Sequence, residues 1–187
     1  PYIPQISLYS YFPENKGLFE ECKGLKTVIF VNGVGEMDNY LFNYCKNLKT
    51  VWWKGKVNRI GVQCFGATGL EQFCVNAKNI DSCAFIGCED LKEIHIRSGV
   101  ENLNMTAFAM LTGIETICLE GIDPDVMEAD WVNLQNSTVT ILVPEDTTDE
   151  QLQLVTQKFA SAYIIINKSQ VQKGSCQLSD DPMPDID

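Results

Sequence analysis

The sequence has little positive charge and almost no histidine. Lys and Arg total 14 against 25 Asp and Glu, so the formal net charge is −11. Duplex nucleic acid and anionic membrane surfaces both attract cationic faces, so this deficit argues against either as the main partner. His95 is the only histidine, which excludes a metal site built from several imidazoles.

Long apolar runs are also lacking. No run approaches the roughly 18 residues that a membrane-spanning helix needs, and the longest aliphatic strings, such as Tyr163–Ile166, have the length of a strand. We therefore expect no membrane insertion. The chain begins at Pro1 without a charged and then apolar leader. We expect that an N-terminal segment such as a signal peptide has been removed, although a cloned fragment would look the same.

What the sequence does have is a globular composition and an internal repeat. Its 187 residues are 45% hydrophobic and 21% charged, which suits one domain with a packed core. Five phenylalanines, spaced 23, 23, 20 and 23 residues apart, mark the repeat: Phe19, Phe42, Phe65, Phe85 and Phe108.

Other apolar residues recur in register with these phenylalanines. A Leu or Ile follows each Phe, further apolar residues lie three and five positions later, and two more columns precede the last four Phe residues by five and eight positions. The columns are Leu25, Leu48, Leu70, Leu91, Ile114; Val28, Val51, Phe73, Ile94, Ile117; Phe30, Trp53, Val75, Ile96, Leu119; Met37, Ile60, Ile80, Leu103; and Val34, Val57, Ala77, Val100. With the Phe column, all 28 positions are apolar, which has a chance probability on the order of 10^-10 at the average frequency.

A period of 20 to 23 residues is typical of a solenoid. The Leu-x-x-Val-x-Phe segment predicts one short strand per coil, and stacked coils then form a parallel sheet with about 4.8 Å between strands. We expect the Val-x-x-Ile stretch to form a second extended piece or turn on the opposite side, with Phe filling the interior. The third unit is shorter, with five residues rather than six from Phe65 to Leu70.

Two segments carry a family resemblance. The residues from Cys83 to Ile96 read C-A-F-I-G-C-E-D-L-K-E-I-H-I, and the segment from Leu41 to Val51 matches the same pattern nearly as well. They resemble the A-F-x-G-C-x-x-L-x-x-I-x-I unit of BspA-like leucine-rich repeats, over roughly residues 18–120. The departures are Glu14, where an apolar residue belongs, and Leu111 in place of the cysteine.

The resemblance implies an α/β solenoid of the leucine-rich-repeat type, a right-handed superhelix of short parallel β-strands with short helical turns and an α+β C-terminal cap. It also implies a secreted or cell-surface protein, because such proteins are typically secreted or surface-attached in host-associated bacteria and some protists, and some are adhesins. Residues 18–120 form five coils in this interpretation.

The ends of the chain depart from the repeat. We expect residues 1–17 to form an N-terminal cap or partial coil, and residues 121–169 to form a C-terminal cap of strand, helix and strand, with a further helix start at Asp123-Pro124. Thr148 and Gln151 have capping-box spacing for the main helix, whose apolar face holds Leu152, Val155 and Phe159. Residues 170–187 read as a flexible acidic tail.

The eight cysteines predict buried free thiols rather than disulfides. Cys22, Cys45 and Cys88 share one column, where stacked side chains point the same way, whereas a disulfide needs Cβ atoms that converge to about 3.8 Å. We expect some of these thiols to donate to turn carbonyls. Only Cys176, in the tail, suits pairing between chains.

The residues between the inward columns should lie on the outer face of the sheet. The central row is Ile29, Trp52, Cys74, His95 and Cys118, with flanks that contain Thr50 and Glu93 on one side and Val31, Lys54 and Arg97 on the other. An apolar patch of Ile29, Val31 and Trp52 with a polar rim is typical of a protein interface, although an N-terminal cover or simple cross-strand packing is the plainer interpretation. The predicted binding face is Ile29, Val31, Thr50, Trp52, Lys54, Cys74, Glu93, His95 and Arg97.

A catalytic alternative uses the same central row. Cys74 or Cys118 beside His95 would pair a thiol nucleophile with a base, but no residue is identifiable that orients the histidine or forms an oxyanion hole. As zinc ligands, Cys74 and Cys118 would lie about 10 Å apart, too far for one ion. The sequence therefore predicts no catalytic residue, no metal and no cofactor.

We expect a monomeric, non-enzymatic interaction or adhesion module that binds a protein or glycan through the sheet face. The alternatives are the cysteine-dependent enzyme and a purely structural spacer within a larger surface protein.

Overall fold

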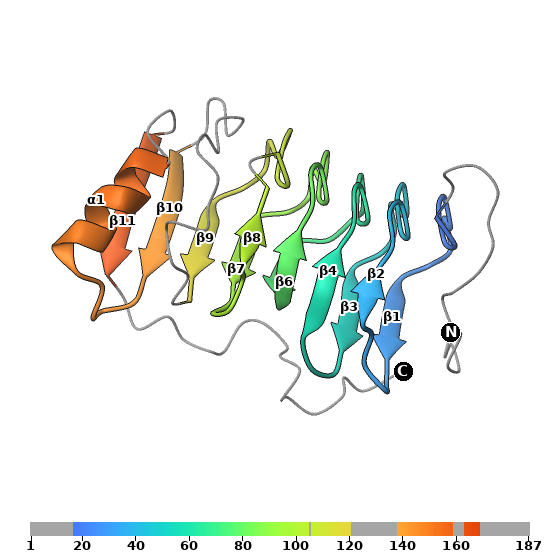
Figure 1. Ribbon diagram of the computed structural model, residues 1–187. Helices are drawn as coiled ribbons and strands as arrows, with labels where there is room; N and C mark the ends of the chain where they lie inside the picture. Colours follow the sequence, from blue (N-terminus) through green and yellow to red (C-terminus); the bar gives the residue numbers. More distant parts are fainter. Residues whose placement is uncertain (1–16, 105, 121–137, 159–162, 169–187) are drawn as a thin grey trace.

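The computed structural model describes residues 17–104, 106–120, 138–158 and 163–168. Within them the chain forms a parallel β-solenoid in which coils follow one another in sequence order, from β1 at one end to β10 and β11 at the other (Figure 1). This is the solenoid that the repeat predicted. The expected terminal segments 1–16 and 170–187 and the helix start at Asp123 lie outside the described residues.

Each coil contributes a strand to one side of the solenoid and most contribute one to the other. On the first side lie β1 (Thr27–Phe30), β3 (Thr50–Trp53), β5 (Gln72–Val75), β7 (Glu93–Ile96), β9 (Thr116–Leu119), β10 (Thr138–Val143) and β11 (Tyr163–Lys168). On the second side lie β2 (Glu36–Met37), β4 (Val57–Ile60), β6 (Ala77–Ile80) and β8 (Asn102–Leu103). The second side confirms the extended piece predicted from Val-x-x-Ile.

Strand register follows the repeat register. Equivalent residues of successive coils pair in parallel, as in Thr27↔Thr50 and Ile94↔Ile117 on the first side and Ile60↔Ile80 on the second. The inward columns are accordingly buried: Leu48, Leu70 and Leu91 are all 0% exposed. The core is therefore the continuous apolar filling between the two sides of the solenoid.

The five phenylalanine rings stack in a single file along the solenoid. Successive ring centroids lie 5.6, 5.5, 5.3 and 5.2 Å apart from Phe19 to Phe108, with interplanar angles of 7 to 24°. The backbone beside them forms a third line of contacts, because the amides of Phe42, Phe65 and Phe85 donate to carbonyls of the next coil. The expected helical turns are single hydrogen-bonded turns at this edge.

These turns require the left-handed backbone region. The residue two positions after each Phe has a positive φ, and the residue two positions before does so in three coils. The residues after Phe are Glu21, Tyr44, Ala67, Gly87 and Met110, with φ between 50 and 67°. Of these five residues, only Gly87 adopts the left-handed region without a steric cost, because the Cβ atom of the other four crowds the backbone there.

Two of the column cysteines make the hydrogen bond expected of them. The Cys45 thiol donates to the carbonyl oxygen of Phe19 at 2.9 Å, and the Cys88 thiol donates to that of Phe65 at 3.0 Å. Burial raises the pKa of each thiol to about 11. Both are free, as are the other four cysteines named with them: Cys22, Cys64, Cys83 and Cys118.

Cys74 departs from this pattern, because it is disulfide-bonded. The prediction that Cys74 is a free thiol is therefore wrong. Stacking within one column keeps the thiols of Cys22, Cys45 and Cys88 from converging, but Cys74 lies outside that column, on the outer face. The eighth cysteine of the sequence, Cys176, lies outside the described residues.

The first side is interrupted between β3 and β5. β1 and β3 form a two-stranded sheet, whereas β5 belongs to a separate sheet with β7, β9, β10 and β11, so the described strands β3 and β5 do not pair. The interruption coincides with the shortened turn from Phe65 to Leu70. Side chains still cross it: the rings of Trp53 and Phe73 lie 5.7 Å apart, and the Lys49 ammonium pairs with the Glu71 carboxylate at 2.9 Å. We call this interruption the seam.

Helix α1 (Asp149–Lys158) lies at the β10–β11 end of the solenoid (Figure 1). Its predicted capping box is confirmed, because the Gln151 amide donates to Thr148 Oγ1 and the Thr148 amide donates to Gln151 Oε1. Leu152 and Val155 pack on the core, which is where an amphipathic helix covers the open end of a repeat array. The side chain of Phe159 lies outside the described residues.

Candidate functional site on the first side of the solenoid

The predicted binding residues lie on four strands, β1, β3, β5 and β7, or directly after them. Ile29 on β1 pairs with Trp52 on β3, and Cys74 on β5 pairs with His95 on β7, which pairs in turn with Cys118 on β9. The structure therefore brings the predicted residues together in two groups. Ile29, Val31, Thr50, Trp52 and Lys54 lie on one side of the seam, and Cys74, Glu93, His95 and Arg97 lie on the other.

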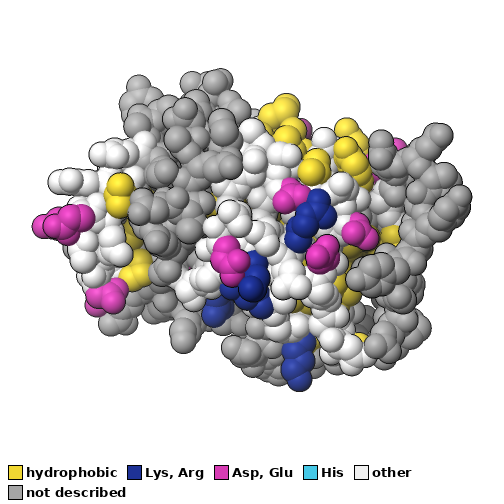
Figure 2. All heavy atoms as spheres, viewed as in Figure 1, with side chains coloured by type: hydrophobic (Ala, Val, Ile, Leu, Met, Phe, Trp, Pro, Cys, Tyr) yellow, Lys and Arg dark blue, Asp and Glu magenta, His cyan; other side chains and the backbone are white. Residues whose placement is uncertain are grey.

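Most side chains of the central row are shielded from solvent, whereas the flanking side chains reach the solvent. Trp52, His95 and Cys118 are 6%, 3% and 1% exposed. Lys54 is exposed and Glu93 and Arg97 are half-buried. On the face seen in Figure 2, Lys or Arg side chains lie next to Asp or Glu side chains rather than in a separate basic patch.

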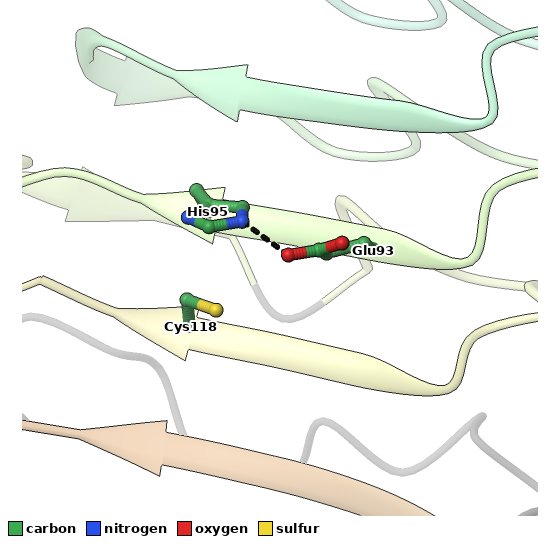
Figure 3. A group of neighbouring side chains, drawn as sticks. All are labelled: Glu93, His95 and Cys118. Carbon is green, nitrogen blue, oxygen red and sulfur yellow. Dashed lines mark hydrogen bonds and ion pairs between the residues drawn. The ribbon is translucent and has the colours of Figure 1, made fainter. Parts of the chain in front are cut away.

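The densest polar arrangement centres on His95. In Figure 3, His95 and Glu93 project from β7 to the same side as Cys118 on the neighbouring strand β9. His95 Nε2 lies 2.5 Å from Glu93 Oε1, and Nδ1 lies 3.4 Å from Glu120 Oε1. Arg97 Nε lies 3.0 Å from Glu120 Oε2. We call these five residues, Glu93, His95, Arg97, Cys118 and Glu120, the His95 cluster.

The local sequence accounts for the His95 cluster. Residues two apart on a strand share a face, so Glu93, His95 and Arg97 line up along β7 and its end, and Cys118 and Glu120 do the same along β9. Parallel register then sets Cys118 directly beside His95. A glutamate at either end of the imidazole is therefore a consequence of strand alternation and pairing.

The electrostatics of His95 reflect competing effects. Burial disfavours the charged imidazole, but hydrogen bonds with Cys118, Glu120 and Glu93 outweigh it and raise the pKa of His95 to about 10. With both nitrogens facing carboxylates, the ring of the protonated form donates in both directions. Held in this way, His95 favours the protonated form near neutral pH and is not poised as a general base.

Comparison with known families identifies the chain. The family model described as BspA type leucine rich repeat region matches residues 15–115 in six copies, more than half of the chain. The protein belongs to the BspA-type leucine-rich repeat family. The six matched copies exceed the five phenylalanine-centred units by one. No curated protein and no solved structure matches the chain.

Membership of the BspA-type family makes the protein a repeat protein-interaction module. The family is typically non-enzymatic and usually surface-associated. Among the described residues, no helix is both long enough and apolar enough to cross a membrane.

In this BspA-type chain the catalytic alternative is weakened by the structure. Cys74 is disulfide-bonded and has no thiolate to attack with. Cys118 is free but 1% exposed, and the neighbouring imidazole is occupied by two glutamates. A Cys118 nucleophile would need a route for substrate to the sulfur and a histidine nitrogen that accepts a proton.

One functional group escaped prediction from the sequence. Glu120, which directly follows β9, is not among the predicted binding residues, although it contacts both His95 and Arg97. The available signal was its position two residues after Cys118 and one coil after Arg97 in the same column.

The atoms of Glu93, His95 and Cys118 that can ligate a metal all lie within 4.8 Å of one another.

Proposed function

We propose that this BspA-type chain is a non-enzymatic adhesion or interaction module of a secreted or cell-surface protein, which binds a protein or glycan through the first side of the solenoid. The supporting observation is the in-register parallel pairing of β5, β7 and β9, which sets equivalent outward side chains side by side on a sheet backed by stacked rings. Such a face presents polar groups at preset separations without an ordering cost on binding.

Surface residence is supported by the usual location of the family and by the disulfide at Cys74, because disulfides persist in oxidising compartments. Five coils span about 24 Å, enough for roughly one standard interface. A monomer suffices for such a face. The contact residues that we propose are the flanks, the half-buried Thr50 and exposed Lys54 on one side of the seam and the half-buried Glu93 and Arg97 on the other. Buried Trp52 and His95 and half-buried Ile29, Val31 and Cys74 support them.

The test is a binding screen of the whole chain against immobilised extracellular-matrix proteins and a glycan array, followed by affinity measurements on any ligand found. We expect Thr50→Ala combined with Lys54→Ala to weaken binding at least tenfold. Lys78→Ala, an exposed lysine on the second side, is the matched control and should bind as the wild type does. Equal affinities of both variants would remove the first side as the binding face.

A further inference from the structure

We propose that Glu93, His95 and Cys118 form a binding site for one divalent transition-metal ion, and that Zn²⁺ suits the three ligands best. This inference does not depend on the proposed interaction function. It assigns a second property to the polar end of the same sheet face.

The backbone sets the three ligands in place before any ion binds. His95 and Cys118 are direct partners in the parallel pairing of β7 and β9, and Glu93 lies two residues before His95 on the same face. Figure 3 shows the three side chains converging from two adjacent strands. A site on paired strands needs no ordering of a loop, so its ligands are already close in the metal-free protein.

The distances are near those of a zinc centre. Bond lengths of about 2.0 to 2.3 Å around a tetrahedral Zn²⁺ place ligand atoms roughly 3.3 to 3.8 Å apart. Glu93 Oε1 and His95 Nε2 lie closer than this, at 2.5 Å, and the whole set lies within 4.8 Å. Side-chain rotations that move atoms by about 1 Å satisfy the geometry.

The chemistry of the donors selects the class of ion. Carboxylate oxygen, imidazole nitrogen and thiolate sulfur together suit a borderline-soft ion such as Zn²⁺ or Co²⁺ and disfavour Ca²⁺ and Mg²⁺, which prefer oxygen alone. A dication balances the charges of the carboxylate and the thiolate. Three protein ligands leave a fourth position for water, on the side where Glu93 is 33% exposed.

Two further residues, Glu120 and Arg97, hold the histidine ligand in place from behind. Binding of the ion displaces the proton on His95 Nε2 and the thiol proton of Cys118, both of which are released to solvent. Nδ1–H is then left to donate to Glu120 Oε1, which lies 3.4 Å away. Arg97 in turn holds the other oxygen of Glu120 at 3.0 Å. Carboxylates that orient a metal-bound histidine in this way are a regular feature of zinc sites, so Glu120 is a positioning residue.

The site is tested with Zn²⁺ and Co²⁺ alone, using the full chain without a histidine tag, under anaerobic conditions and without added thiols, which would compete for metal and reduce the disulfide. Isothermal titration with Zn²⁺ should give one site with a dissociation constant of about 1 µM or tighter. The Co²⁺ complex should show a thiolate-to-cobalt charge-transfer band, which only a cysteine ligand produces.

Variants separate this site from adventitious binding. Cys118→Ser should abolish the charge-transfer band and weaken Zn²⁺ binding more than 100-fold, and Glu93→Gln, on the solvent side, should weaken it at least tenfold. Glu120→Gln should weaken it about 10- to 100-fold while keeping the band, as second-shell changes do. Circular dichroism of the metal-free variants establishes that they are folded.

Cys83→Ser and Glu101→Gln are matched controls, because Cys83 is also a free cysteine and Glu101 a glutamate in an ion pair on the second side. Both should bind as the wild type does. The proposal is overturned if Zn²⁺ fails to bind below about 100 µM, if the Co²⁺ spectrum lacks the thiolate band, or if folded Cys118→Ser and Glu93→Gln retain wild-type affinity.

Discussion

Replacing Phe65 by alanine tests the physical basis of the solenoid. The Phe65 ring is 0% exposed and lies between the rings of Phe42 and Phe85, at centroid distances of 5.5 and 5.3 Å. Phe73 contacts it from the strand side at 4.9 Å. Truncation therefore opens a cavity at the middle of the file, where neighbours are fixed by both sheets and have little freedom to collapse.

The free energy of unfolding is expected to fall by about 3 to 5 kcal/mol, the usual cost of replacing a buried aromatic side chain by alanine. With a urea dependence of about 2 kcal/mol per molar, the unfolding midpoint falls by roughly 2 M. Because each coil is stabilised mainly by its direct neighbours, the cavity also weakens the coupling between the two halves of the array.

Urea titration followed by circular dichroism measures this loss. Lys49→Ala is the control, because the Lys49 side chain is 45% exposed and its ion pairs with Glu71 and Asp90 contribute little in water. The control should lose less than about 0.5 kcal/mol. A loss below about 1 kcal/mol for Phe65→Ala, or comparable losses for both variants, would refute the inward assignment of the Phe column.

Two further predictions concern the turns and the thiols. Ala67 has a φ of 50°, so Ala67→Gly should be neutral or stabilise the protein by up to about 1 kcal/mol. The control Ala77→Gly, in β6, should destabilise the protein by about 1 to 2 kcal/mol. Thermal unfolding measures both variants, and a loss of stability in Ala67→Gly would contradict the prediction. Burial raises the pKa of the Cys45 and Cys88 thiols from an ordinary 9.0 to about 11, so the unfolded state releases these protons first as the pH rises. The contribution of these protonated thiols to stability should be complete below about pH 9 and lost as the pH rises through 11. Between pH 7 and 10.5, the urea midpoint should therefore fall less steeply with pH in the double Cys-to-Ala variant than in the wild type. Identical pH dependences of the two midpoints would contradict the raised pKa of the thiols.

The repeat columns predicted most of the fold. Phe, Leu and Val positions recur in register, and burial of these columns is the dominant favourable term, so the stacking of rings and the pairing of equivalent residues follow from spacing alone. The turn geometry is less visible, because Glu21, Tyr44 and Met110 occupy a backbone region in which glycine would be the expected signal.

The candidate site was predicted only in part. Alternation placed His95 and Cys118 side by side, but it does not specify rotamers, and the contact of Glu120 with His95 depends on them. Cys74 was missed for another reason. A disulfide is decided by the approach of two chain segments in space, which column spacing within the repeat does not report.

The seam gives the molecule an uneven stiffness. Across it, hydrogen-bonded strand pairing continues on the second side from β2 through β4 to β6, while the described strands β3 and β5 on the first side are not paired. A load that bends the long axis therefore meets less resistance on that side, and the curvature of the rod changes most between the second and third coils. Exchange of coils between homologous arrays at this joint would break no pairing between β3 and β5.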